Sequence, residues 1–167
     1  DKIEKRKSIG VRDDNFMIIS VGELNKNKNH SVIIKAISKL KNDNIKYIIC
    51  GQGSLENDLK ELSKELGIRQ QVIFLGYRKD IPELMNIADV FAFPSYREGL
   101  SLSLMEAMVS GLPVVCSNIR GNSDLIKNGE GGYLVKPNDI GGWKKAIESI
   151  YHEDSIEMGR TNKKNIK

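Results

Sequence analysis

The sequence contains very little cysteine and histidine, and this shortage excludes several kinds of site. Cys50 and Cys116 are the only cysteines, and each lies in or ends a short apolar run, so we expect two buried, reduced thiols. With His30 and His152 as the only histidines, no CxxC pair or Cys–His cluster predicts a metal site. No Ser–His–Asp or Cys–His arrangement can be assembled either. His30 stands at the start of a predicted helix, where we expect a structural or exposed role rather than a catalytic one.

Long apolar runs are also missing. No run approaches the roughly 18 residues that a membrane-spanning helix needs. No apolar segment follows the N-terminal DKIEKRK, as it would in a signal peptide. With 40% apolar and 29% charged residues among 167, the composition is typical of one globular domain. Together with the reduced thiols, this predicts a cytoplasmic protein.

The excess of positive charge is confined to the two ends of the chain. Lys and Arg number 26 against 22 Asp and Glu, which gives a net charge of +4. Residues 1–7 contribute +2 and residues 160–167 contribute +4, which leaves −2 on the part between them. A nucleic-acid-binding domain would carry positive charge on its folded face, so we expect no nucleic-acid partner. We interpret the ends as solvated, with weak attraction to an anionic membrane surface as the alternative.

Short apolar runs rich in β-branched residues alternate with longer segments of helical periodicity. The predicted strands are 16–21, 45–50, 72–75, 90–93, 113–116 and 133–135. The predicted helices are 30–41, 54–66, 81–88, 103–110 and 139–151. This alternation predicts an α/β fold, a Rossmann-like doubly wound parallel sheet of about six strands. The predicted domain is 15–152, whereas 1–14 and 153–167 lack apolar periodicity and are interpreted as a connecting segment and a polar tail.

Ligands of such sheets bind at the carboxyl ends of the strands, so the loops there hold the candidate residues. Gly51-Gln52-Gly53 follows the second strand, but it lacks the third glycine of a dinucleotide-binding fingerprint. We favour a tight turn at this point, with Ser54 as the helix N-cap. Asp80 is likewise interpreted as the N-cap of the helix that contains Pro82.

The segment EGLSLSLMEAMVS at 98–110 is the most informative. Gly99 allows a ligand to approach the backbone closely. The N–H groups of residues 99–103 lie at a predicted helix start, where free donors and the helix dipole favour an anion. Ser103 and Glu106 have the spacing of a capping box, so a structural role for them is an open alternative. No capping role explains Glu98. The residues alone therefore predict an anion- or nucleotide-binding α/β domain.

The spacing of Glu98 and Glu106 belongs to a longer pattern. Its pieces are SVGELNKNKNH at 20–30, GQGSLENDL at 51–59, VIFLGYRKDIPELMNIADVFAFPS at 72–95, REGLSLSLMEAMVSGLPVV at 97–115 and KNGEGGYLV at 127–135. In this order they resemble the C-terminal, donor-binding domain of the retaining GT-B-fold glycosyltransferases of family 4, often called "glycosyl transferases group 1". The resemblance covers residues 15–152.

The resemblance implies a role for each matching residue. It assigns the catalytic roles to Glu98, near the hydroxyls of the transferred sugar, and to Lys28, at the phosphates. The donor-binding residues that it implies are Gly22, Lys28, Tyr77, Arg78, Glu98, Gly99, Leu100, Ser101 and Glu106. The amides of 99–101 are expected to hold the diphosphate, Glu106 the ribose, and the loop 76–79 the nucleobase. No metal ion and no cofactor are expected besides the nucleoside-diphosphate sugar.

One position departs from the family pattern. The family commonly has an arginine where this chain has Glu23. An arginine there would make charge-assisted hydrogen bonds to phosphate, whereas a carboxylate would repel it. Either Glu23 points away and Lys28 acts with fewer helpers, or the diphosphate lies differently.

The resemblance also implies partners. Enzymes of this family have two Rossmann-like domains, and the acceptor-binding N-terminal domain is absent from this sequence, so we expect an excised domain or a fragment. The implied activity moves a sugar to a glycan or lipid-linked acceptor, with peripheral contact at the inner membrane face. The alternatives are a non-catalytic nucleotide-sugar-binding module that acts through a partner chain, and half of a sugar-nucleotide epimerase. A signalling receiver domain ranks last, because only Glu23 supplies an acid after the first strand.

Overall fold

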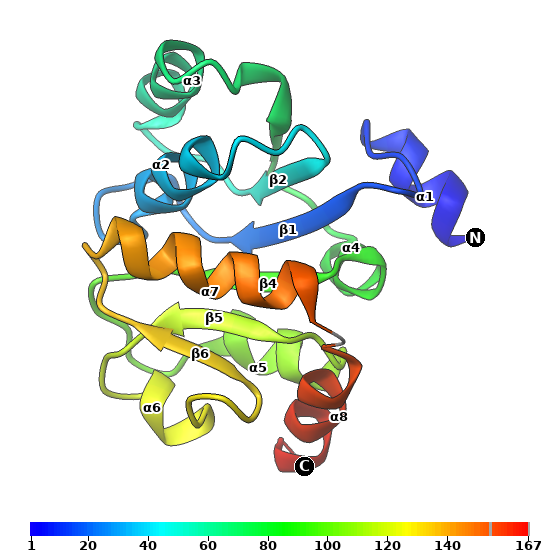
Figure 1. Ribbon diagram of the computed structural model, residues 1–167, viewed down its shortest axis with the longest axis vertical. Coiled ribbons are helices and arrows are strands. Elements are labelled where there is room, and N and C mark those ends of the chain that lie inside the picture. Colours follow the sequence, from blue (N-terminus) through cyan, green and yellow to red (C-terminus); the bar gives the residue numbers. More distant parts are fainter. Residues whose placement is uncertain (154, 167) are drawn as a thin grey trace.

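Six parallel strands form one sheet in the computed structural model, which describes residues 1–153 and 155–166. The strands are β1 Phe16–Val21, β2 Ile45–Cys50, β3 Val72–Gly76, β4 Val90–Phe93, β5 Val114–Ser117 and β6 Gly132–Val135 (Figure 1). Their order across the sheet is β3-β2-β1-β4-β5-β6, so the order reverses at the boundary between β1 and β4. The predicted doubly wound parallel sheet is confirmed.

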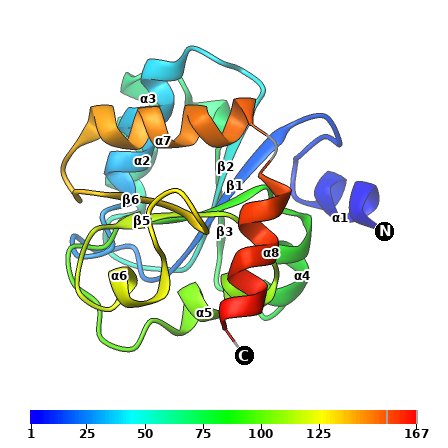
Figure 2. The ribbon, with the colours of Figure 1, turned by 60° about the horizontal axis from the view of Figure 1, so that its bottom comes forward.

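Helices cover both sides of the sheet. One layer consists of α2 (His30–Leu40), α3 (Glu56–Glu65) and α7 (Ile140–His152) (Figure 2). The other contains α4 (Ile81–Ile87) and α5 (Leu102–Val109), with α1 (Lys2–Ser8) beside α4. α8 (Ile156–Asn165) packs against α5, while α6 (Asn122–Leu125) and the 3₁₀-helix η1 (Arg69–Gln71) lie in connections.

A separate apolar core fills the space on each side of the sheet, because the central strands are buried on both faces. Within β1, Ile18 packs in the same core as Trp143 of α7, whereas Met17 belongs to the core beneath α4 and α5. Cys50 and Cys116 are free and buried in that second core, as expected. Burial raises the pKa of the Cys50 thiol to about 12, so this thiol stays protonated and inert at neutral pH.

The predicted strands and helices agree with the structure to within one or two residues, but the helix ends contain corrections. α3 begins after Leu55, so Ser54 is not its N-cap. Asp80 does occupy the N-cap position of α4, although its carboxylate makes no capping bond. The helices α1, α6 and α8 were not predicted.

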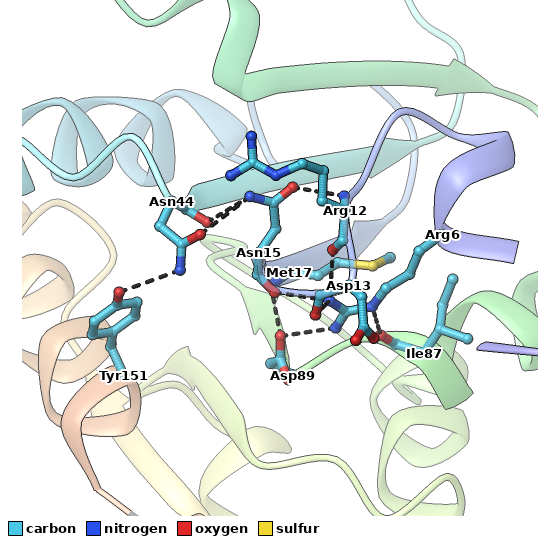
Figure 3. A network of polar contacts seen from close by, with 9 residues as sticks. All are labelled: Arg6, Arg12, Asp13, Asn15, Met17, Asn44, Ile87, Asp89 and Tyr151. Atoms are coloured by element: carbon cyan, nitrogen blue, oxygen red, sulfur yellow. Dashed lines mark hydrogen bonds and ion pairs between the residues drawn. The ribbon is translucent and has the colours of Figure 1, made fainter. Parts of the chain in front are cut away.

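The N-terminal segment is not simply solvated, because the Arg6 side chain of α1 is buried at the amino ends of the strands and only 1% exposed. Its guanidinium donates to the carbonyl oxygens of Ile87 (2.9 Å), Arg12 (3.1 Å), Asp13 (3.1 Å) and Asn15 (2.8 Å), and to Asp89 Oδ2 (3.0 Å) (Figure 3). Asp89 Oδ2 also accepts the Met17 amide of β1 (2.7 Å). The buried cation is therefore paired and hydrogen-bonded, and these interactions offset the free-energy cost of removing it from water.

The C-terminal segment is not simply solvated over residues 155–166, and Asp154 and Lys167 lie outside the described residues. Gly159 of α8 lies against Gly111, where an added Cβ would come within 1.9 Å of the Gly111 carbonyl oxygen. Asn162 is buried, and its Nδ2 donates to the carbonyl oxygens of Leu112 and Gly131 (both 2.7 Å). Close backbone contact and one amide side chain therefore hold α8 in place.

Replacing Arg6 with Met is expected to lower the free energy of unfolding by about 3 kcal/mol, because Asp89 and several carbonyl oxygens lose their donor. Urea unfolding followed by circular dichroism measures the change. Lys7 is exposed on the same helix, so Lys7→Met is the matched control and should change stability little. Equal stability of Arg6→Met and Lys7→Met would contradict the anchoring role of Arg6.

Candidate functional site

The loops after β1 and β4 meet where the strand order reverses. Neighbouring loops leave the sheet toward opposite faces at such a point and open a crevice that binds ligands. Asn27 ties the two loops together. The Tyr96 amide donates to the Asn27 carbonyl oxygen (2.9 Å), Asn27 Nδ2 donates to the Arg97 carbonyl oxygen (2.9 Å), and the Arg97 amide donates to Asn27 Oδ1 (3.0 Å). The crevice therefore has a fixed width at this point.

An ion pair between Lys28 and Glu98 spans the crevice. Lys28 Nζ lies 2.7 Å from Glu98 Oε2, and the side chains are 24% and 12% exposed. The Lys28 stem crosses Gly22, where an added Cβ would lie 3.2 Å from Lys28 Cδ, and its Nζ lies 5.8 Å from the ring centroid of Phe93. Gly22 therefore leaves room for the lysine, and the fold brings together three of the predicted site residues.

Asn29 fixes the loop that carries Lys28, and His30 is buried beside it. Asn29 has φ 59°, a left-handed conformation that asparagine tolerates. Its Nδ2 donates to the carbonyl oxygens of Pro94 (3.0 Å) and Pro137 (2.8 Å). His30 is buried, as expected of a structural residue. Burial, reinforced by the charge of Lys28, lowers the pKa of His30 to about 4, so the imidazole is neutral at pH 7.

The backbone leading into α5 presents free donors beside this ion pair. Ser101 occupies the N-cap position of α5. Within the described residues, the N–H groups of Gly99, Leu100 and Ser101 donate no hydrogen bond. Such donors at the start of a helix form an anion-binding site.

The structure also decides between the two interpretations of Ser103 and Glu106. Because Ser101 is the N-cap and makes no side-chain capping bond, the capping-box alternative is wrong. Glu106 is exposed in the middle of α5. Its carboxylate has no hydrogen-bond partner among residues 1–153 and 155–166, so it is free to bind a ligand.

A cavity of about 460 Å³ lies at the carboxyl ends of β1, β2 and β3. Its lining includes Gly22, Glu23, Gln52, Tyr77 and Arg78. The structure therefore brings the predicted residues Tyr77 and Arg78 to one cavity with Gly22. Glu23 is exposed there, and its Oε2 accepts a hydrogen bond from Asn25 Nδ2, which satisfies part of the carboxylate locally.

The two glycines of Gly51-Gln52-Gly53 serve close packing of the β1 and β2 loops. A Cβ at Gly51 would lie 2.0 Å from the Gly22 carbonyl oxygen, and one at Gly53 would lie 2.4 Å from that of Leu24. The Leu24 amide donates to the Gln52 carbonyl oxygen (3.0 Å). The tight turn favoured from the sequence is therefore found, and its glycines allow the backbones of the β1 and β2 loops to lie in contact.

Comparison with known proteins identifies the family. The sequence model described as "Glycosyl transferases group 1" matches residues 1–167. The chain belongs to this family. Among the described residues of this group 1 chain, no group of three or more His, Cys, Asp or Glu side chains could hold a metal ion. No helix in the same part of the chain combines the length and apolarity needed to cross a bilayer.

Curated relatives of the group 1 chain include enzymes named for lipid-linked sugars. The UDP-Gal:alpha-D-GlcNAc-diphosphoundecaprenol alpha-1,3-galactosyltransferase of Escherichia coli is 32% identical over 166 residues, which cover 96% of this chain and 43% of the relative. The N-acetylgalactosamine-N,N'-diacetylbacillosaminyl-diphospho-undecaprenol 4-alpha-N-acetylgalactosaminyltransferase of Campylobacter jejuni is 33% identical over 158 residues, covering 94% of this chain and 42% of the relative. The chain thus spans less than half the length of these relatives.

Solved structures show the same fold. HepE of Anabaena in complex with UDP and glucose matches with a TM-score of 0.88 and 27% identity, over 99% of this chain and 46% of that one. TarM of S. aureus, solved with UDP among its ligands, matches with a TM-score of 0.86 and 24% identity, over 92% of this chain and 32% of that one. The expected relationship to GT-B glycosyltransferases is confirmed at the level of the fold.

The asparagines that shape the site around Lys28 and Glu98 were not predicted from the sequence. Asn27 and Asn29 position Lys28, while Asn122 lies behind the α5 start and donates to the Ser117 carbonyl oxygen (3.1 Å). The signal for Asn27 and Asn29 was the asparagine-rich loop 25–29, because amide side chains often bond to backbone in tight loops. Which partners they bond cannot be inferred from spacing, because these lie up to 108 positions away in the sequence.

The low pKa of His30 predicts pH-dependent stability. The imidazole protonates near its ordinary pKa of 6.5 in the unfolded chain but only near 4 in the folded one. The unfolded state therefore binds more protons between these values, and the free energy of unfolding falls as the pH decreases, by up to about 1.4 kcal/mol per pH unit from this group.

Urea unfolding at a series of pH values from 7 to 4 measures this dependence. His30→Asn should have a shallower loss of stability than the wild-type chain. His152→Asn, at an exposed histidine, should keep the wild-type slope. If His30→Asn and wild type lose stability in parallel, the imidazole is not the responsible group.

Proposed function

We propose that the chain is the donor-binding domain of a retaining glycosyltransferase. It would bind a nucleoside-diphosphate sugar, whose sugar is moved to a glycan or lipid-linked acceptor. The observation that carries this proposal is the Lys28–Glu98 ion pair beside the free amides of residues 99–101, at the reversal of strand order. Cationic and N–H donors beside an acidic group match a ligand that joins a diphosphate to a sugar.

The ion pair leaves both partners with capacity for the donor. An ammonium group has three N–H donors, and Glu98 takes one from Lys28, so two remain for phosphate oxygens. Glu98 Oε1 has no partner among the described residues, so it can accept a sugar hydroxyl. Lys28 would thus hold the phosphates and orient the carboxylate toward the sugar at the same time.

Catalysis in this proposal is mainly electrostatic. Negative charge accumulates on the diphosphate as its bond to the sugar breaks. Lys28 and the amides of Gly99, Leu100 and Ser101 would stabilise that charge, and preorganised donors of this kind typically contribute several kcal/mol. Because Lys28 supplies positive charge and the amides supply aligned N–H donors, we propose a reaction that needs no metal ion.

The remaining predicted residues would hold the nucleoside. Glu106 lies about 7 Å along α5 from the free amides, at 1.5 Å per residue, and its unpaired carboxylate can accept the ribose hydroxyls. Tyr77 and Arg78 line the neighbouring cavity, which would take the base. Asn25 donates a hydrogen bond to the Glu23 carboxylate. This supports the alternative in which Glu23 does not bind the phosphates and Lys28 acts on them with fewer helpers.

The relatives support the acceptor class and the need for a second domain. Two of them are named for diphosphoundecaprenol-linked acceptors. Since the chain spans less than half of each, we propose that the acceptor site belongs to a further domain of the complete enzyme. Action at the inner membrane face stays a prediction.

Glu106→Ala is expected to weaken nucleotide binding by about 1–3 kcal/mol, because it removes the proposed acceptor for the ribose hydroxyls. Isothermal titration of the chain with UDP, GDP and ADP, without added metal, measures the effect. Glu148→Ala is the matched control, since Glu148 is an exposed helical glutamate on α7. A folded Glu106→Ala variant with wild-type affinity would remove Glu106 from the site.

A product assay separates the proposed transferase from its alternatives. The chain is combined with a separately supplied acceptor domain, a lipid-linked acceptor and the sugar nucleotide that it binds. Sugar transfer is expected only in the combined sample. Epimerised sugar nucleotide without acceptor would favour the epimerase, and tight binding without any product would favour the non-catalytic module.

A further inference from the structure

Arg78 lines the proposed nucleoside cavity in a restrained position. It is the second residue after β3, and its side chain is 29% exposed. Arg78 Nε donates to Asp80 Oδ1 (2.8 Å) and Nη2 donates to Asp80 Oδ2 (2.7 Å). A bidentate pair of this kind fixes the plane of the guanidinium as well as its charge. The remaining Nη1 donors and the flat face of Arg78 are left for a ligand.

Asp80 binds a second cation from another part of the chain. Its Oδ2 also accepts a hydrogen bond from Lys5 Nζ of α1 (2.6 Å), across 75 positions of sequence. The hydrogen bonds from Arg78 and Lys5 hold the pKa of the Asp80 carboxyl far below its usual range. Asp80 is therefore ionised when the chain is folded near neutral pH. Its carboxylate makes no capping bond to α4 and instead accepts hydrogen bonds from two cations.

Lys5 reaches Asp80 from a helix that is itself anchored. The neighbouring Arg6 binds the carbonyl oxygen of Ile87 at the end of α4 and the carboxylate of Asp89 (Figure 3). α1 therefore packs beside α4, with Lys5 bound to its N-cap residue Asp80 and Arg6 bound to its last residue, Ile87. Because α1 contacts both ends of α4, the backbone that carries Lys5 is held in place beside Asp80.

We propose that Lys5 and Asp80 are positioning residues that hold Arg78 in the donor cavity and thereby couple the docking of α1 to ligand binding. This inference rests on the proposed function for the identity of the ligand, a nucleoside diphosphate. Coupling of this kind is reciprocal. A nucleotide that contacts Arg78 should strengthen the attachment of α1, and loss of the Lys5 contact should weaken nucleotide binding.

Titration calorimetry of the full chain with UDP, GDP and ADP tests the inference. Asp80→Asn keeps the size of the side chain and removes its charge, and should weaken binding of the preferred nucleotide about tenfold. Lys5→Met should weaken it about threefold, the size expected of a partly exposed ion pair. Lys7→Met is the matched control on the same helix and should leave the affinity unchanged, because the Lys7 side chain is exposed and has no partner among the described residues.

The double variant Asp80→Asn/Arg78→Met separates positioning from general damage. If Asp80 acts through Arg78, the double variant binds no more weakly than Arg78→Met alone. Losses that add in the double variant would overturn the inference, as would wild-type affinity in Asp80→Asn and Lys5→Met. A wild-type chain that binds none of the three nucleotides would instead contradict the proposed function.

Hydrogen exchange gives an independent readout that does not depend on folding of the Asp80 variant. Adding the preferred nucleotide to the wild-type chain should slow exchange of the α1 amides. This slowing should be lost in Lys5→Met and kept in Lys7→Met. Equal slowing in both variants would overturn the coupling between α1 and the cavity.

Discussion

The pairing of β1 with β2 on one side and β4 on the other is the constraint on which the site depends. β1 pairs with β2 along its whole length, from Phe16 opposite Ile45 to Val21 opposite Cys50, and with β4 through Ile18 and Ile19. Buried strands satisfy their backbone only through such pairing, so this arrangement cannot shift without loss of the core. The reversal of order beside β1 then places the β1 and β4 loops together, and with them Lys28 and Glu98.

Charged residues act at both ends of this sheet, in different ways. At the amino ends, the Arg6 guanidinium is tied to four carbonyl oxygens and to Asp89, and Asp89 also accepts the Met17 amide. At the carboxyl ends, Lys28 and Glu98 bind each other with one contact and keep donors and an acceptor free. The first arrangement is suited to holding a helix in place, and the second to holding a ligand that carries both phosphates and hydroxyls.

Much of this structure can be predicted from the sequence, because the six strands are apolar runs and their helices have clear apolar stripes. α1 and α8 could not be, since Arg6, Gly159 and Asn162 hold them through backbone contacts that leave no periodic signal. The glutamates of the 98–106 motif are visible in the sequence. The partner of Glu98 is not, because 70 positions separate it from Lys28. The predicted helix cap at Ser54 is wrong, and the capping box left open at Ser103 is not formed, because local sequence permits several neighbouring helix starts and tertiary packing selects one.

The most direct measurement is a nuclear magnetic resonance titration of the ¹⁵N-labelled chain with the nucleoside diphosphate that it binds. If the crevice between the loops that follow β1 and β4 is the donor site, the amide signals of Gly99, Leu100 and Ser101 shift most, together with those around Lys28. Shifts confined to the basic cavity at the opposite end of the sheet, lined by Arg12, Lys46, Lys64 and Arg69, would contradict this location. They would show that the nucleotide binds as a simple polyanion, away from Glu98 and Glu106.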